Sequence, residues 1–292
     1  MTQAFNLSQL ANKVNSSGQL DVATGVTGTQ AVANGGTGQS TYTDGQLLIG
    51  NSTGNTLTKT TLTAGSNISI TNGAGAITLS AAGGFGNMDV LTATGPSTWT
   101  SPPTTTKIKV TVIGGGGGSG GGTGTGGGGA GGSGIKIFSV ATATGYAYTV
   151  GAAGAASPNT GTNGGSGGTS SFGPVGGTTV TCTGGAGSVT SNAVYAVGAV
   201  GGTSSNADFN VSGGRGSPGG ITVPTGANFG GSGGSSIIGS SGGALMMRGP
   251  APSPISSFAA NSYGGGAGGV AAGGGSNSLG AAGFQGVIIV EY

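Results

Sequence analysis

Three short segments are the first candidates for chemistry, because each satisfies the G-x-S-x-G pattern of a nucleophilic serine. They centre on Ser119, Ser166 and Ser232. A serine nucleophile needs a neighbouring base and a sharp turn between a strand and a helix. The chain contains no histidine, and none of the three segments lies between a clear strand and a clear helix. The glycine and serine content therefore explains the matches, and we expect the protein not to be an enzyme.

Other site chemistries find little support in the sequence. No Gly-Lys pair exists for a phosphate loop of the Walker type, and a dinucleotide fingerprint needs a βαβ unit. Without histidine, a single cysteine and dispersed acids make no recognisable zinc site. We expect neither a cofactor nor a metal. Asp208 could join a second carboxylate across a subunit seam, so a polysaccharide-depolymerising spike stays open as an alternative.

Charge and cysteine content limit the kinds of partner and cross-link that the sequence predicts. The formal net charge is +2, and the 4% of charged residues are scattered rather than gathered in a stripe or patch. We therefore expect no nucleic-acid partner and no membrane insertion. Cys182 is the only cysteine, so no intrachain disulfide forms. The N-terminus lacks a signal-peptide pattern, and no window approaches about 18 apolar residues, which predicts assembly in a cytoplasm.

Glycine dominates the composition, with 74 of 292 residues. Each glycine in a strand or helix costs about 0.5–1 kcal/mol relative to alanine, so the fold needs a compensating source of stability. The 34% of hydrophobic residues, arranged in short β-type runs, argues against disorder. The glycines could allow close packing of backbones, or identical chains could share a core around a symmetry axis.

Residues 1–33 form the first expected segment. Phe5, Leu7, Leu10 and Val14 approximate the apolar face of a short helix. An isolated helix of this length is marginal in water and needs a partner surface. An attachment role fits that need, and a helix that caps the fold fits it nearly as well.

Residues 34–84 form the second segment, a β-rich shaft. We expect strands at 46–49, 57–62, 67–71 and 76–80, with a hairpin turn at Asn72-Gly73. Each strand carries only one or two large apolar side chains per face. A segment with so little core is unlikely to fold alone, and a trimeric shaft is the natural geometry.

Residues 85–292 form the third segment, a glycine-rich tip domain. We expect strands at 88–92, 107–113, 135–140, 146–150, 178–183 and 286–292, and the first and last strands would close one β-module. Between them, glycine-rich stretches at 114–134, 151–171, 212–243 and 264–276 exceed ordinary connections in length. They could pack as polyglycine-II-like helices with three residues per turn, with neighbouring chains satisfying the backbone groups.

Several segments resemble tail-fibre proteins of bacteriophages. The shaft and N-terminal resemblance rests on residues 5–14, 32–40, 44–55 and 64–70, and the tip resemblance on 99–102, 107–118, 168–172 and 286–292. The resemblance implies an all-β, elongated homotrimeric fibre on the virion. Its N-terminus would bind a phage tail or baseplate protein, and its tip would bind a bacterial surface glycan or an outer-membrane protein. A purely structural neck or collar fibre without receptor binding stays open as the alternative.

One interruption of the glycine-rich sequence is the candidate receptor-binding loop. Residues 244–258 combine consecutive apolar residues, one cation and three of the ten prolines, which gives contact area at low chain entropy. The residues expected to make contact are Leu245, Met246, Met247, Arg248 and Phe258. A plug that packs over the end of the domain explains the same residues equally well. Tyr195, Asp208, Phe209 and Arg215 lie in other glycine-poor stretches and are weaker candidates.

Overall fold

The structure, a computed structural model, describes the chain except for residues 1–2, 21–29, 31–35, 66–67, 82–83, 160, 191–194, 223–226, 248–256 and 273–277. The described residues form β-strands and a single short helix, so the all-β expectation is confirmed. The chain divides into two compact units, Met1–Gly83 and Gly84–Tyr292. The division falls next to the expected start of the tip domain at residue 85, whereas the expected boundary at residues 33–34 lies outside the described residues.

The first unit contains one helix and two separate hairpins. The helix is α1 (Gln3–Ala11), and the hairpins pair β1 (Gln46–Asn51) with β2 (Thr56–Thr61) and β3 (Ile68–Gly73) with β4 (Ala76–Ala81). The expected turn at Asn72-Gly73 is wrong by two residues. Ala74 and Gly75 form the turn, because Gly75 supplies the positive φ of 69° while Asn72 pairs with Ile77 inside the ladder.

The second unit begins and ends in a β-sandwich of two five-stranded sheets. The first sheet has the order β14 (Phe209–Val211), β8 (Ser133–Ser139), β7 (Lys107–Ile113), β18 (Val287–Glu291) and β5 (Met88–Leu91). The second has the order β13 (Ser204–Ser205), β11 (Val180–Cys182), β10 (Ser170–Gly173), β9 (Gly145–Val150) and β6 (Gly95–Thr100). β18 pairs with both β5 and β7, so the expected closure of the module by its first and last strands is confirmed.

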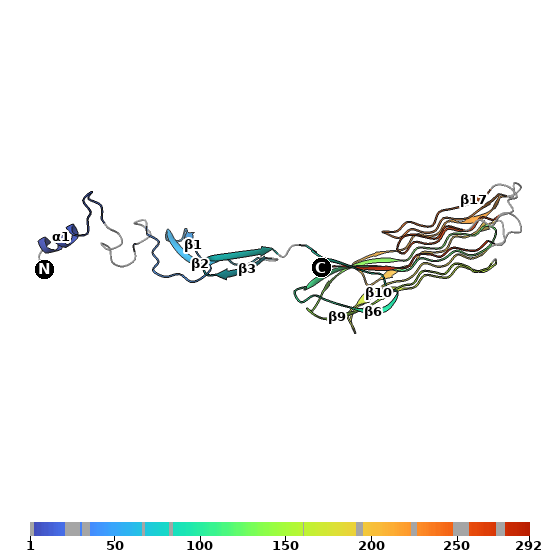
Figure 1. Cartoon of the computed structure of the whole chain (residues 1–292), viewed down its shortest axis with the longest axis horizontal. Coiled ribbons are helices and arrows are strands. Elements are labelled where there is room, and N and C mark those ends of the chain that lie inside the picture. Colours follow the sequence, from blue (N-terminus) through green and yellow to red (C-terminus); the bar gives the residue numbers. More distant parts are fainter. Residues whose placement is uncertain are drawn as a thin grey trace. The chain divides into compact units, whose positions relative to one another are not determined.

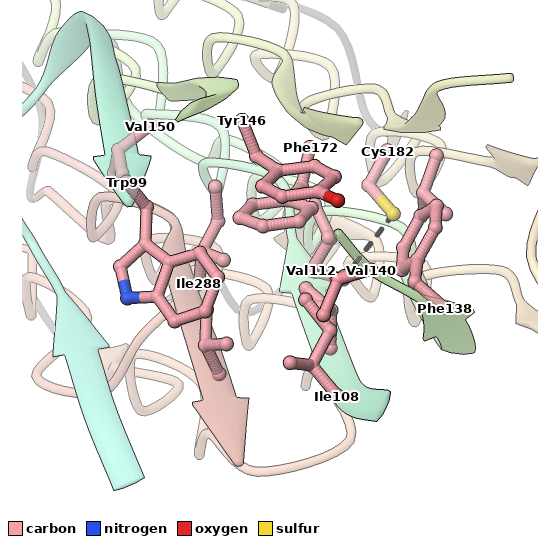
Figure 2. Close-up of a cluster of buried hydrophobic side chains, with 13 residues drawn as sticks. Trp99, Ile108, Val112, Phe138, Val140, Tyr146, Val150, Phe172, Cys182 and Ile288 are labelled. Carbon is pink, nitrogen blue, oxygen red and sulfur yellow. Dashed lines mark hydrogen bonds between the residues drawn. The ribbon is translucent and has the colours of Figure 1, made fainter. Parts of the chain in front are cut away.

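The two sheets enclose the hydrophobic core of the unit (Figure 2). Phe172 is fully buried, and its ring stacks on Tyr146 with a centroid distance of 6.1 Å. Trp99 packs against the same rings, and its indole N–H donates to the Asp89 carboxylate at 2.7 Å. Strand β6, which carries Trp99, was not among the expected strands. Its ladder with β9 shows that the proline and threonines around Trp99 form a sheet edge, where a missing N–H is tolerated.

The glycine-rich stretches run out from the sandwich and back again, side by side, as the long wavy segments of Figure 1. We call them the glycine bundle; it contains the described residues of 114–132, 151–168, 183–203, 212–247 and 257–286. Its hydrogen bonds repeat every three residues: the N–H groups of Gly115, Gly118 and Gly121 donate to Gly168, Gly165 and Thr162 at 2.9, 2.9 and 3.1 Å. The residues between them donate to other neighbours. This repeat is that of a helix with three residues per turn and no internal hydrogen bonds, as the sequence suggested.

Three runs form the centre of the glycine bundle: 114–122, 124–132 and 264–272. Residues 114–122, for example, donate N–H groups to 129–132, 162–168 and 278–284 and accept from 154–161, 185–188 and 267. A Cβ on Gly116 would lie less than 3.0 Å from the carbonyl oxygen of Gly265, closer than real Cβ atoms approach. A run with neighbours on every side has no room for large side chains, so these runs consist mostly of glycine.

In the central runs, the described backbone groups do not need the neighbouring chains that the sequence suggested as partners. The partners of the central runs all belong to the same chain. The long connections between the strands return in antiparallel pairs, which lets one chain supply the whole set of neighbours. The described central runs of the glycine bundle are therefore bonded within a single chain.

Candidate functional site

The distal end of the glycine bundle, farthest from the sandwich, is the candidate site. Asn87 and Tyr292 exchange two backbone hydrogen bonds of 2.9 and 3.0 Å, so the chain enters and leaves the second unit at the sandwich end. Strand β17 (Met246–Met247) lies at the opposite end, as Figure 1 shows. The distal end thus lies apart from the strands of the core.

A small sheet at the distal end arranges several of the candidate residues. It has the order β12 (Tyr195–Ala196), β15 (Gly219–Thr222), β16 (Ala227–Phe229) and β17. Tyr195 pairs with Gly220, Gly220 with Phe229, and Phe229 with Met246, which places these residues in one row across the four strands. Directly paired residues point to the same face of a sheet.

This row faces outward. Tyr195 is 60% exposed and Met246 80% exposed, and Phe229 is half-buried. The neighbouring positions Ala196 and Asn228 are buried against the bundle. The sheet therefore presents two aromatic side chains and a methionine on one surface.

The structure describes the backbone of four of the five predicted receptor-binding residues. Leu245 is half-buried, and its carbonyl accepts the N–H of Gly230 at 2.8 Å. Met246 is the most exposed of the described members, and the backbone of Met247 pairs with Asn228. Arg248 lies outside the described residues.

Besides Phe258, the structure shows a second exposed apolar residue, Leu279, that the sequence did not indicate. The side chain of Phe258 is 54% exposed, and its ring edge lies 3.4 Å from the position that a Cβ on Gly243 would take. The preceding residue, Ser257, donates its hydroxyl to the carbonyl of Leu279 at 3.5 Å, and Leu279 is half exposed. Phe229 and Leu279 were missed because each stands alone beside glycine or serine, with no local pattern to mark it.

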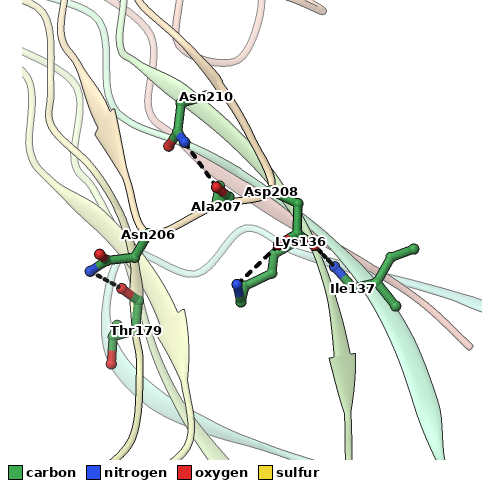
Figure 3. Close-up of polar contacts among 7 residues, drawn as sticks. All are labelled: Lys136, Ile137, Thr179, Asn206, Ala207, Asp208 and Asn210. Carbon is green, nitrogen blue, oxygen red and sulfur yellow. Dashed lines mark hydrogen bonds and ion pairs between the residues drawn. The ribbon is translucent and has the colours of Figure 1, made fainter.

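Two ion pairs join charged groups of the sandwich. Lys109 and Glu291 form an ion pair of 2.6 Å across β7 and β18. Asp208 accepts hydrogen bonds from the Ile137 N–H at 2.9 Å and the Lys136 ammonium at 3.1 Å (Figure 3). These two bonds, the backbone one first, lower the pKa of the Asp208 carboxyl.

Asp208 thus anchors the turn before β14 within its own chain. In the same corner, Asn206 has a positive φ of 63°, and its side-chain amide donates to the Thr179 carbonyl at 3.0 Å. Among the described residues, no group of three or more His, Cys, Asp or Glu side chains could hold a metal ion.

The serines of the three G-x-S-x-G segments serve the packing of the glycine bundle. Ser119 is fully buried and accepts the N–H of Ala281 at 2.8 Å. Ser166 accepts the N–H of Gly187 at 3.4 Å, and the Ser232 hydroxyl lies 3.0 Å from that of Ser217. Each hydroxyl therefore bonds to backbone or to another hydroxyl within the bundle.

The predicted attachment residues lie in the first unit. Phe5, Leu7 and Leu10 are exposed on α1, at 48%, 69% and 50%. Val14 was expected on the same helical face, but this is wrong because the helix ends at Ala11. Val14 instead forms an isolated bridge with Leu20. In the described part of the chain, no helix has the length and apolar character needed to span a membrane.

The first unit also contains an open recess of ≈ 340 Å³ where the two hairpins approach. Tyr42, Asp44, Gln46, Leu47 and Ile77 are among its lining residues. They offer one carboxylate and one phenol beside apolar side chains, without an arrangement that would position a reacting group. The recess and the exposed hairpin faces share one feature, which is apolar surface left open to solvent.

The comparisons define the class of protein. The profile of the glycine-rich domain family matches residues 91–292. The match covers more than half of the chain, and the chain therefore belongs to this glycine-rich domain family. No curated protein matches the sequence.

Proposed function

We propose that the protein is a bacteriophage tail fibre, a homotrimer on the virion whose glycine-rich domain contacts the host surface. The proposal combines the resemblance of the shaft and tip segments to tail fibres with three structural features: an incomplete first unit, a self-contained second unit and an exposed distal surface. Residues 1–33 would attach the fibre to a tail or baseplate protein through Phe5, Leu7 and Leu10.

The incomplete first unit carries the assembly part of the proposal. Its hairpins are two separate two-stranded sheets, and a two-stranded hairpin is at best marginally stable alone in water. Leu47, Ile49, Ile68 and Leu79 are all exposed on them, Leu79 at 59%. Association of identical chains would bury these side chains around a common axis and complete the missing core.

The distal surface carries the recognition part. Tyr195 and Met246 extend from one side of the distal end, while Phe258 and Leu279 extend from runs at residues 257–262 and 278–286. Aromatic and methionine side chains are enriched in binding surfaces because they provide large contact areas. The rigid glycine bundle would hold these side chains away from the sandwich, toward a bacterial glycan or outer-membrane protein.

In the alternative hypothesis, residues 244–258 form a plug that packs over the end of the domain and binds no receptor. The ring of Phe258 covers Gly243, and Leu245 is bonded to Gly230, so both described ends of the 244–258 stretch are part of the bundle. A structural fibre without receptor binding would need no more than this. Exposure of Met246 and Tyr195 favours recognition, because a plug has no use for side chains in solvent.

Adsorption assays distinguish these alternatives. We expect phage carrying Met246→Ser together with Tyr195→Ser to assemble normally but to lose most of its adsorption to host cells. The matched control is Val175→Ser, which changes an 85% exposed apolar residue in the turn after β10, in the sandwich. Unchanged adsorption by the double variant would contradict recognition through this surface. Light scattering of the purified protein tests assembly, and a mass of 26.7 kDa, that of one chain, would contradict the trimer.

A further inference from the structure

The two outer faces of the sandwich differ in chemistry. On the sheet that contains β9 and β10, one row of directly paired residues faces away from the core and consists of Pro96, Thr149, Ser171, Thr181 and Ser205. These are the side chains expected on a sheet face in contact with water.

The corresponding row on the other sheet is apolar. It consists of Val90, Ile289, Thr111, Ile135 and Phe209. Val90 is 45% exposed and Phe209 60% exposed, and the next row adds Met88 and Ile137. We call this surface the apolar sheet face.

The two central charges of the apolar sheet face neutralise each other. Lys109 and Glu291 lie between Met88 and Ile137 in the second row, and they form the ion pair of 2.6 Å. Lys107, at the start of β7, is left at the rim. A charged partner would gain little from such a surface, whereas an equally apolar and internally neutralised surface would fit it.

We propose that the apolar sheet face docks against the same face of other copies of this chain in the assembled fibre. The inference rests on the proposed association through the first unit. The partner of the apolar sheet face is a second copy of the chain for two reasons. The surface is mostly neutral and apolar, and association through the first unit brings copies of the surface close together.

The connection between the two units supplies this proximity. β4 ends at Ala81 and β5 begins at Met88, so β5 of each copy lies within about 25 Å of the end of its own shaft hairpin. Copies joined through their hairpins would hold their β5 strands at a high effective concentration, and the second contact then becomes intramolecular within the assembly.

The size of the face explains why this tether is needed. Five strands about 4.8 Å apart, each with about two residues on the face, cover about 300 Å². A stable interface between separate proteins buries about 800 Å² per partner. The apolar sheet face is therefore too small to associate without the shaft, but large enough to add to an assembly that already exists.

Cysteine cross-linking of the full-length chain tests this proposal. The native Cys182 is fully buried, and burial raises the pKa of its thiol to about 12, so we expect it not to react. A chain with a single added cysteine can then be joined by a short bismaleimide only to another copy. Val90→Cys probes the apolar sheet face, Thr98→Cys is the matched control on the exposed polar face, and Leu79→Cys reports association of the hairpins.

We expect Val90→Cys and Leu79→Cys to give cross-linked chains and Thr98→Cys to give single chains. If Leu79→Cys cross-links and Val90→Cys does not, docking of the apolar sheet face is refuted while the assembly of the shaft stands. If the Val90→Cys thiol is also protected from a monofunctional maleimide, residues of its own chain cover the face, which again refutes the proposal. If neither variant cross-links and the mass is that of one chain, the proposed homotrimer fails first.

Discussion

Replacing one central glycine by alanine tests whether the glycine bundle is held by backbone packing. Gly116 lies in a fully buried run; its N–H donates to Phe284 at 2.8 Å, and its carbonyl accepts from Gly154 at 2.8 Å. A Cβ at this position would overlap the carbonyl oxygen of Gly265, which itself accepts the N–H of Phe284 at 2.9 Å. The obstacle is backbone on a neighbouring run, so no side chain can rotate away.

To accept the methyl group, the runs must separate and weaken these hydrogen bonds. Overpacking costs typically about 1–3 kcal/mol, and each weakened hydrogen bond adds about 1 kcal/mol. We expect Gly116→Ala to destabilise the second unit by about 2–4 kcal/mol, which corresponds to a fall in Tm of roughly 5–15 °C for a domain of this size. Thermal unfolding followed by circular dichroism measures this shift.

The matched control is Gly86→Ala. Gly86 belongs to the same unit, but a Cβ there meets no atom within 4 Å, and its φ lies outside the positive region. We expect its Tm to stay the same or to rise slightly, because alanine reduces the entropy of the unfolded chain. Equal Tm values for the two variants would refute the conclusion that close backbone contact excludes side chains from the centre of the bundle.

Three further predictions follow from the described residues. Residues 84–292 expressed alone should be folded and monomeric by light scattering, because the core and the bundle are complete within one chain. The thiol of Cys182 should not react with a maleimide at pH 8 in the folded protein, because its folded pKa of about 12 lies above the ordinary 9.0. The contribution of the buried, protonated thiol to the stability of the fold is therefore full below about pH 9 and is lost as the pH rises toward 12. Asp208→Asn should reduce the loss of Tm on acidification. The Ile137 N–H and Lys136 lower the pKa of Asp208 in the folded protein below 3.8. The contribution of the Asp208 carboxylate to stability is therefore present above pH 3.8 and is lost as the pH falls through the folded pKa, and the variant lacks this loss.

Local patterns predicted the strands of the sandwich well. The alternation in residues 107–113 and the apolar run near the C-terminus became β7 and β18, next to each other in the sheet. The strand at 95–100 was missed, because proline and threonine around Trp99 look like a loop until the edge position of β6 is known. The turn at Ala74 and Gly75 was misplaced, because two glycine-containing pairs compete in that hairpin and only strand register chooses between them.

The candidate site was predicted only in part. The glycine-poor stretch at 244–258 marked Met246 and Phe258, both of which are exposed at or beside the distal end. Phe229 could not be predicted as a site residue, because it belongs to the exposed row only through its pairing with Met246. Pairing between strands of two or three residues leaves no periodic pattern in the sequence. The apolar sheet face was hidden for the same reason, since its row draws a single residue from each of five strands.

By itself, the sequence determined the all-β class and the division into a first unit with little core and a glycine-rich domain. It also determined the three-residue packing of the long stretches, because only glycine allows backbones to approach so closely. Tertiary structure decided which runs lie at the centre, that one chain supplies all their neighbours, and which side chains meet on the distal surface and the apolar sheet face. These depend on contacts between residues far apart in the chain, and in a sequence this repetitive many registers are locally equivalent, so only the complete set of hydrogen bonds and buried side chains selects one of them.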